Sequence, residues 1–232
     1  MATGTIQIIQ NDKKDKWYLT DGLTESDVVA AYQFVYAPSK EDALVNINEG
    51  TKYTLSAGSS ARWCYSSGID FQDGVSSNLN LTNSTLSGLA SSIKSAIYGF
   101  HWKNWAVGNL ISIGLTDNRW LGHSNNLTSG TQWGFLMNGG NGWKSIGWRC
   151  PSGTLGCNFE ENYIYVNGTK NTAGNSINGP YGRNHAILVY QAGDIGNAAG
   201  CVVPALVFYN KALTEAQHMA ISRNIVNLGA IL

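Results

Sequence analysis

The stretch Cys201-Val-Val-Pro-Ala-Leu-Val-Phe-Tyr-Asn-Lys-Ala-Leu-Thr-Glu-Ala-Gln217 decides the fold. Its apolar run over 202–209 predicts one buried strand, and the two polar residues that follow end it. Thr214 and Gln217 then form a capping box, in which each side chain satisfies a free backbone amide at the start of a helix. We expect that helix to stop just before Gly229. The segment therefore predicts a strand, a turn and a helix in succession.

The rest of the chain is typical of short strands separated by turns. Its 232 residues include 27 glycines, and only 13% of them are charged, against the ~25% usual in soluble domains. Apolar runs recur about every ten residues, which is typical of a single all-β sandwich or barrel. The chain has eight tryptophans and eleven tyrosines. With so few charged residues, this composition favours a surface that stacks on and hydrogen-bonds to neutral polar ligands.

Individual runs give more specific predictions. Residues 28–36, 44–47 and 68–71 are predicted strands, and 163–166 is a strand that enters an Asn-Gly hairpin turn. A Pro/Gly-rich loop is predicted between residues 150 and 157.

The four cysteines leave two readings open. Cys150 and Cys157 flank the predicted loop and would bridge in an oxidising compartment, whereas all four are free thiols otherwise. Cys64 and Cys201 fall inside apolar strands.

Charge and hydropathy exclude several partners. The formal net charge is zero, and without clustered positive charge we expect no nucleic-acid partner. No apolar run approaches the ~20 residues of a membrane helix, so we expect no membrane insertion. The first ten residues lack the basic and apolar regions of a secretory signal peptide.

Three pieces of sequence resemble the concanavalin A-like, laminin-G-like jelly-roll superfamily. They are Val207-Phe-Tyr-Asn-Lys-Ala-Leu-Thr-Glu-Ala-Gln217, Tyr163-Ile-Tyr-Val-Asn-Gly-Thr169, and the opening that runs from Ala31-Tyr-Gln-Phe34 through Ala43-Leu-Val-Asn-Ile-Asn48 to Gly68-Ile-Asp-Phe71. The opening resembles the subgroup found in phage virion fibre and decoration proteins. Together these pieces span most of residues 28–226.

The resemblance implies a two-sheet antiparallel jelly-roll sandwich with a short C-terminal helix. It implies a jelly-roll domain over 26–232, preceded by an N-terminal arm or tether over 1–25. It further implies a phage virion-surface protein, a head or tail fibre or adhesin module made in the host cytoplasm. Its partners would be a host-surface glycan or receptor and other virion proteins, with a homo-oligomer as an option.

Two alternatives stay open, since this fold carries several functions. The first is a purely structural capsid decoration or cement protein. The second is a glycoside hydrolase or lyase, which needs two carboxylates on one face of a strand. Glu25-Ser-Asp27 is the nearest pattern, while Glu160 and Glu161 are adjacent and would lie on opposite faces. We therefore expect no catalytic residues.

The tryptophan- and asparagine-rich middle is the predicted glycan site. Aromatic rings stack on sugar C–H faces, while amide and guanidinium groups bind the hydroxyls. Loop-flanking aromatic residues and nearby polar ones make up the predicted carbohydrate-binding set: Trp120, Trp143, Asn125, Asn141, Arg119, His123, Tyr181 and Arg183. The competing reading is that these tryptophans belong to the core.

No cofactor is required by this reading, but bound Ca²⁺ is compatible with it. Calcium prefers carboxylate and carbonyl oxygens. The candidate ligands are loop aspartates: Asp70, Asp73, Asp117 and Asp194.

Overall fold

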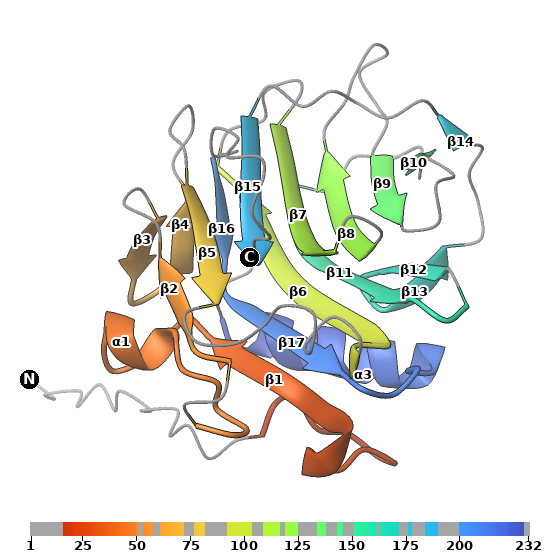
Figure 1. The fold of residues 1–232 in the computed structure, drawn as a ribbon, viewed down its shortest axis with the longest axis horizontal. Helices are drawn as coiled ribbons and strands as arrows, with labels where there is room; N and C mark the ends of the chain where they lie inside the picture. Colours follow the sequence, from red (N-terminus) through yellow and green to blue (C-terminus); the bar gives the residue numbers. More distant parts are fainter. Residues whose placement is uncertain are drawn as a thin grey trace, which may run out of the picture.

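The computed structural model describes residues 16–50, 53–57, 61–71, 77–81, 92–103, 109–116, 119–124, 134–137, 143–145, 151–161, 163–171, 176–177, 184–189 and 200–229. These residues form two β-sheets, with the C-terminal helix α3 on the outer side of the first sheet (Figure 1). The helical segments are η1 (Glu25–Asp27), α1 (Lys40–Ala43) and α3 (Glu215–Asn227).

The first sheet has nine strands in the described part of the chain: β1 (Val28–Gln33), β3 (Ala61–Cys64), β4 (Gly68–Phe71), β6 (Ser95–Trp102), β11 (Ser152–Asn158), β12 (Tyr163–Val166), β13 (Thr169–Asn171), β16 (Cys201–Val203) and β17 (Ala205–Tyr209). Its main path is β13-β12-β11-β6-β16-β4-β3. β17 continues β16 beyond Pro204 and pairs with β6 on one side and with β1 on the other. The Pro204 carbonyl accepts the backbone N–H groups of Phe34 and Val35 at 2.8 and 3.1 Å.

The second sheet has eight strands among the described residues: β2 (Leu55–Ala57), β5 (Ser77–Leu81), β7 (Asn109–Thr116), β8 (Arg119–Ser124), β9 (Gly134–Met137), β10 (Trp143–Ser145), β14 (Ser176–Ile177) and β15 (Asn184–Val189). Their order is β14-β10-β9-β8-β7-β15-β5-β2. All of these pairs are antiparallel except those of β15, which runs parallel to both β5 and β7.

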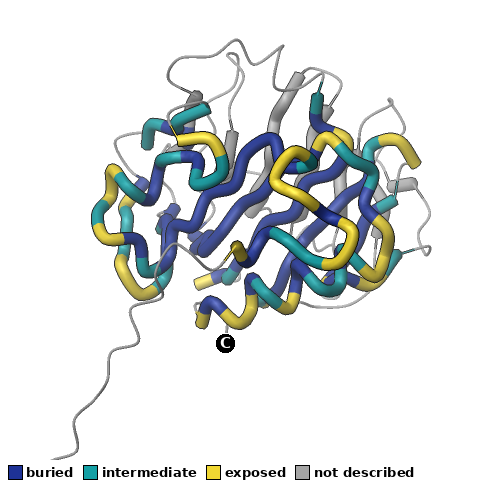
Figure 2. The backbone as a smooth tube through the Cα atoms, turned by 90° about the horizontal axis from the view of Figure 1, so that it is seen from below, coloured by how far each residue is buried: buried dark blue, intermediate teal, exposed yellow. Residues whose placement is uncertain are grey.

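Two hydrophobic clusters hold these layers together. The first cluster lies between the sheets, where Leu55 and Leu79 of the second sheet pack with Tyr98, Leu206 and Phe208 of the first. The second cluster lies on the opposite face of the first sheet, where β1, β6 and β17 pack against α3. Because the first sheet is covered on both faces, every residue of β1 and β17 is buried, as in sheets with helices over one side. Figure 2 shows these strands as a buried layer, with exposed residues in the segments around it.

The structure confirms the predicted fold class, a mostly antiparallel β-sandwich that ends in a helix. The N-cap of α3 is confirmed as well, since Gln217 N–H donates to Thr214 Oγ1 at 3.3 Å. Gly229 follows the helix with a φ of +83°. In the predicted hairpin, Asn167 and Gly168 have φ angles of +50° and +79°, as a type I′ turn requires.

Four local predictions were wrong. Residues 44–47 are not a strand, because α1 precedes them and the N–H groups of Leu44 and Val45 donate back to the carbonyls of Glu41 and Asp42, at 3.2 and 3.4 Å. The predicted loop before residue 157 contains β11, a nearly fully buried strand beside β6. The predicted single strand over 202–209 is interrupted at Pro204, and β15 breaks the expected antiparallel pattern.

The N-terminal segment joins the folded unit before residue 26. Trp17, Tyr18 and Leu23 are buried in the second cluster. The Tyr209 hydroxyl donates to the Tyr18 carbonyl at 2.7 Å, and the Asn224 side chain donates to the Trp17 carbonyl at 2.8 Å. The arm was predicted over residues 1–25; residues 16–25 of that range include these buried side chains, and residues 1–15 lie outside the described residues.

Candidate functional site

Four of the predicted glycan-binding residues occupy two strands of the second sheet. Arg119, Trp120 and His123 lie in β8, and Trp143 begins β10. β9 separates these two strands and pairs with both. Fold topology therefore brings together residues that are 24 positions apart in the sequence.

The pairing register divides these four residues between the two faces of the sheet. Successive strand positions alternate between faces, and Leu79 of β5 lies on the face that packs into the first cluster. The register carried from β5 through β15, β7 and β8 puts His123 and Arg119 on that core-facing side. It puts Trp120 and Trp143 on the opposite side, which we call the outer face.

The two tryptophan positions lie close together on the outer face. Trp143 pairs with Leu136 of β9, which pairs in turn with Gly122 of β8. Trp120 and Trp143 are thus two strand spacings apart, ~10 Å, and two residues offset along the sheet, ~7 Å. The β7 position opposite Trp120 is Gly114, whereas the β9 position beside Trp143 is Leu136.

The remaining predicted site residues divide differently. Asn125, Asn141, Tyr181, Arg183, Asp73, Asp117 and Asp194 lie outside the described residues. Asp70 lies in β4, where its carboxylate accepts from the Lys103 ammonium in an ion pair. Within the described ranges, no three His, Cys, Asp or Glu side chains come together in a way that suits a metal ion.

The alternatives for Cys157 were a disulfide with Cys150 and a free thiol, and the structure has the free thiol. Cys157 is a fully buried free thiol, as is Cys201, and Cys64 is a half-buried free thiol. Burial raises the pKa of the Cys157 and Cys201 thiols far above the usual range. Cys150 lies outside the described residues.

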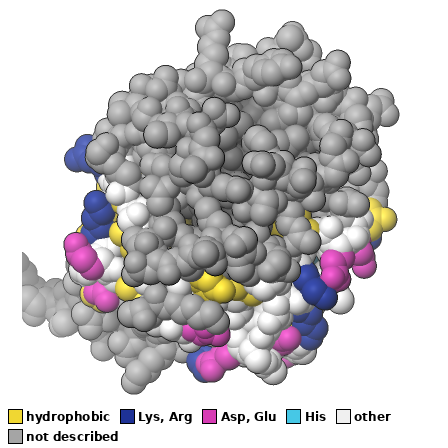
Figure 3. All heavy atoms as spheres, in the orientation of Figure 1, with side chains coloured by type: hydrophobic (Ala, Val, Ile, Leu, Met, Phe, Trp, Pro, Cys, Tyr) yellow, Lys and Arg dark blue, Asp and Glu magenta, His cyan; other side chains and the backbone are white. Residues whose placement is uncertain are grey.

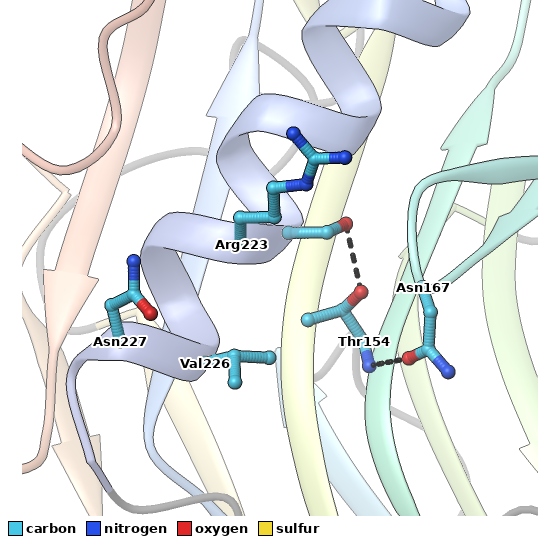
Figure 4. Close-up of a pocket in the computed structure, with 6 residues that line it drawn as sticks. Thr154, Asn167, Arg223, Val226 and Asn227 are labelled. Carbon is cyan, nitrogen blue, oxygen red and sulfur yellow. Dashed lines mark hydrogen bonds between the residues drawn. The ribbon is translucent and has the colours of Figure 1, made fainter.

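A pocket on the other side of the molecule was not predicted. It has a volume of about 190 Å³ and lies between α3, β11 and the turn that follows β12 (Figure 4). Its lining consists of Thr154, Asn167, Ser222, Arg223, Val226 and Asn227. Sequence reasoning missed it because β11 was read as a loop and because Thr154 and Ser222 are far apart in the chain.

The hairpin turn and α3 approach each other unusually closely beside this pocket. A Cβ atom on Gly168 would lie 2.3 Å from Met219 Cα, so only glycine allows this contact. The Asn167 side chain accepts the Thr154 N–H at 2.9 Å. The turn therefore both ends the hairpin and fixes the wall of the pocket.

One turn earlier, α3 buries a histidine completely. The His218 ring stacks on Tyr165 with 3.7 Å between centroids and 11° between planes. Neither ring nitrogen has a hydrogen-bond partner. Burial lowers the pKa of His218 to about 3, and burial also raises the pKa of Tyr165 to about 12. Both rings are therefore neutral at ordinary pH.

Charged side chains on the described surface are of mixed sign. Lys and Arg alternate with Asp and Glu along the lower rim in Figure 3. The ion pairs include Lys16–Glu25, Lys94–Glu160 and Lys211–Asp27. In the described part of the chain, no helix is long and apolar enough to cross a membrane.

The chain is similar to known proteins in its structure but not in its sequence. No family model matches the chain, and no curated protein matches it. Trypanosoma rangeli sialidase in complex with sialic acid matches over 88% of this chain, with a TM-score of 0.58 and 14% identity. A structure described as a receptor-binding domain matches over 87% of this chain, with a TM-score of 0.51 and 12% identity.

This chain corresponds to only part of each of the two matched proteins. This chain covers 34% of that sialidase chain and 51% of the receptor-binding domain. At such low identity the likeness concerns the fold alone. The chain therefore has the concanavalin-like β-sandwich architecture, which it shares with part of the sialidase and part of the receptor-binding domain.

Proposed function

We propose that this chain is a non-enzymatic carbohydrate- or receptor-binding module whose ligand lies on the outer face of the second sheet. The observation that carries the proposal is the register that puts Trp120 and Trp143 on one face, together with Gly122 and Leu136. A sheet face with aromatic and aliphatic residues offers a platform on which sugar rings stack. The register puts His123 and Arg119 on the core-facing side, so the proposal does not rest on these two residues.

The comparisons support this class of function without specifying the ligand. The sialidase structure contains sialic acid, and the second match is described as a receptor-binding domain. Both are proteins that recognise another molecule, and the same architecture in this chain is compatible with such a role.

The described acidic residues support a role without catalysis. Glu25 and Asp27 lie in η1 rather than in a strand, and Asp27 accepts the Thr24 N–H at 2.8 Å. Glu160 pairs with Lys94, and Asp70 pairs with Lys103. Each of these carboxylates thus has a structural partner.

We further propose that this chain is a virion-surface protein of a phage, a fibre or adhesin module made in the host cytoplasm. This proposal rests on the resemblance of the opening segment to phage virion proteins. A single shallow sugar site binds weakly, and many copies on one particle would raise the avidity by orders of magnitude.

A glycan array with matched variants tests the binding proposal. The wild type, Trp120→Ala, Trp143→Ala and the double variant are compared, with and without a chelator. Tyr65→Ala is the control, since Tyr65 is an aromatic residue with 47% exposure away from this face. We expect each tryptophan variant to lose at least ~10-fold in affinity, or ~1.4 kcal/mol, while the control keeps full binding.

Two results would count against the proposal. Wild-type protein that binds no glycan in either condition would favour the structural decoration or cement role. Equal losses in the control and in the tryptophan variants would show that the outer face is not the binding surface. Thermal unfolding followed by circular dichroism verifies that each variant is folded.

A further inference from the structure

The pocket beside α3 is separate from the outer face of the second sheet. It opens on the side of the first sheet that α3 covers, whereas the outer face belongs to the other sheet. Its volume of about 190 Å³ is below the ~300 Å³ at which pockets for drug-sized ligands begin. The pocket therefore has room for one compact group and excludes an extended chain.

Two buried hydroxyl groups are fixed in place at the floor of the pocket. Thr154 and Ser222 are buried, and the Thr154 hydroxyl donates to Ser222 Oγ at 2.8 Å. The Ser222 hydroxyl acts as acceptor there and keeps its own proton for another acceptor. The Asn167 side chain is held by the Thr154 N–H, as Figure 4 shows.

The rim supplies a positive charge that has no counter-charge among the residues that the structure describes. Arg223 is exposed, and its Nη2 donates to the Met219 thioether at 3.2 Å, a weak acceptor. No carboxylate in the described residues forms an ion pair with Arg223, whereas Lys16, Lys94 and Lys103 each have one. A guanidinium at a pocket rim binds a carboxylate through two parallel hydrogen bonds.

The rim also has an apolar element. Val226 is 40% exposed, more than the other large aliphatic side chains whose burial the structure describes. It lines the same pocket as the amide of Asn227. A guanidinium, a hydroxyl, an amide and an apolar side chain together match the carboxylate, the hydroxyls and the C–H face of an acidic sugar.

We propose that this pocket binds a single carboxylate-bearing sugar ring, such as a uronic acid. Arg223 binds the carboxylate, Ser222 and Asn227 bind ring hydroxyls, and Val226 contacts the ring carbons. The proposal does not depend on the glycan site of the second sheet, because the two sites share no residue.

Amide chemical shifts followed by NMR test this site directly. D-Glucuronate, D-glucose and acetate are titrated separately into the ¹⁵N-labelled full chain. We expect glucuronate to shift the amides of residues 154, 167 and 222–227 with a millimolar Kd. Glucose lacks the carboxylate and acetate lacks the ring, so each should bind at least ~10-fold more weakly.

Matched variants assign the effect to the pocket. Arg223→Gln and Val226→Trp change exposed positions, the first removing the charge and the second filling the space. Both should abolish the glucuronate shifts, while Arg62→Gln, an exposed arginine of β3, should preserve them. The proposal would be overturned if glucose or acetate bound as tightly as glucuronate. It would also be overturned if Arg223→Gln left the shifts unchanged, or if the wild type showed no shifts.

Discussion

The buried His218 makes the stability of this fold depend on pH in a specific window. The ordinary pKa of histidine is 6.5, and burial lowers that of His218 to about 3. The unfolded chain therefore binds a proton below pH 6.5 that the folded protein cannot accept. The contribution of the neutral ring to stability is fully present above pH 6.5 and is lost as the pH falls towards 3.

The size of the effect follows from the two pKa values. Each pH unit between them costs ~1.4 kcal/mol, so acidification from pH 7.5 to 4.5 removes roughly 3 kcal/mol and acidification to pH 3 removes roughly 4 kcal/mol. The range from pH 6.5 to 4.5 is the most informative about His218. Asp27, whose pKa is lowered from 3.8 by the Thr24 N–H, contributes its own losses only at lower pH.

The substitution His218→Phe isolates the contribution of His218 to the pH dependence of the unfolding free energy. Phenylalanine keeps an aromatic ring on Tyr165 and removes two buried nitrogens that have no hydrogen-bond partner. At pH 7.5 we expect the variant to be within about 1.5 kcal/mol of the wild type, since an apolar replacement of similar shape is well tolerated. At pH 4.5 the variant should be more stable, by roughly 3 kcal/mol relative to the difference at pH 7.5.

Urea unfolding followed by tryptophan fluorescence at pH 7.5, 6.5, 5.5 and 4.5 measures this difference. The reasoning would be refuted if the unfolding free energies of the two proteins stayed parallel over that range. Parallel curves would mean that His218 titrates equally in the folded and unfolded chains, and hence that its ring is not sealed from water.

Three further predictions concern packing and capping. Gly168→Ala should destabilise the fold by roughly 1–3 kcal/mol in urea unfolding, because residue 168 has a φ of +79° and its Cβ would collide with Met219; an unchanged midpoint would contradict this contact. Thr214→Ala should cost ~1 kcal/mol through loss of the helix cap, and Thr214→Ser should restore most of it. Cys157 should resist a thiol-specific disulfide reagent in the native state, whereas half-buried Cys64 should react; mass spectrometry of the labelled peptides distinguishes the two sites.

The accuracy of the sequence predictions depended on how local the signal was. The α3 cap and the Asn167-Gly168 turn were predictable because their chemistry lies within four residues. Residues 44–47 were misread because apolar alternation was weighed above the Ser39 and Asp42 signal for a helix start. β11 was misread because its glycines were taken as turn residues, although Gly156 is required by the close approach of His218.

The candidate sites were less predictable, because they depend on pairing between distant segments. The tryptophans were singled out by their flanking turns, but the face on which each lies follows from the register through β15, β7 and β8. The parallel pairing of β15 gives no signal in the local sequence. The α3 pocket required β11, the hairpin and the helix to be assembled first.

The position of β17 between β1 and β6 governs when the protein can fold during synthesis. β1 and β6 are translated before residues 205–209, which pair with β1 and with one edge of β6, whose other edge pairs with β11. Until those residues leave the ribosome, β1 and that edge of β6 expose unpaired backbone groups and apolar side chains, a state prone to aggregation. The first sheet must therefore be completed after most of the domain has been translated. Expression at reduced temperature, or with chaperones that hold nascent chains, should raise the soluble yield more than any change to the surface.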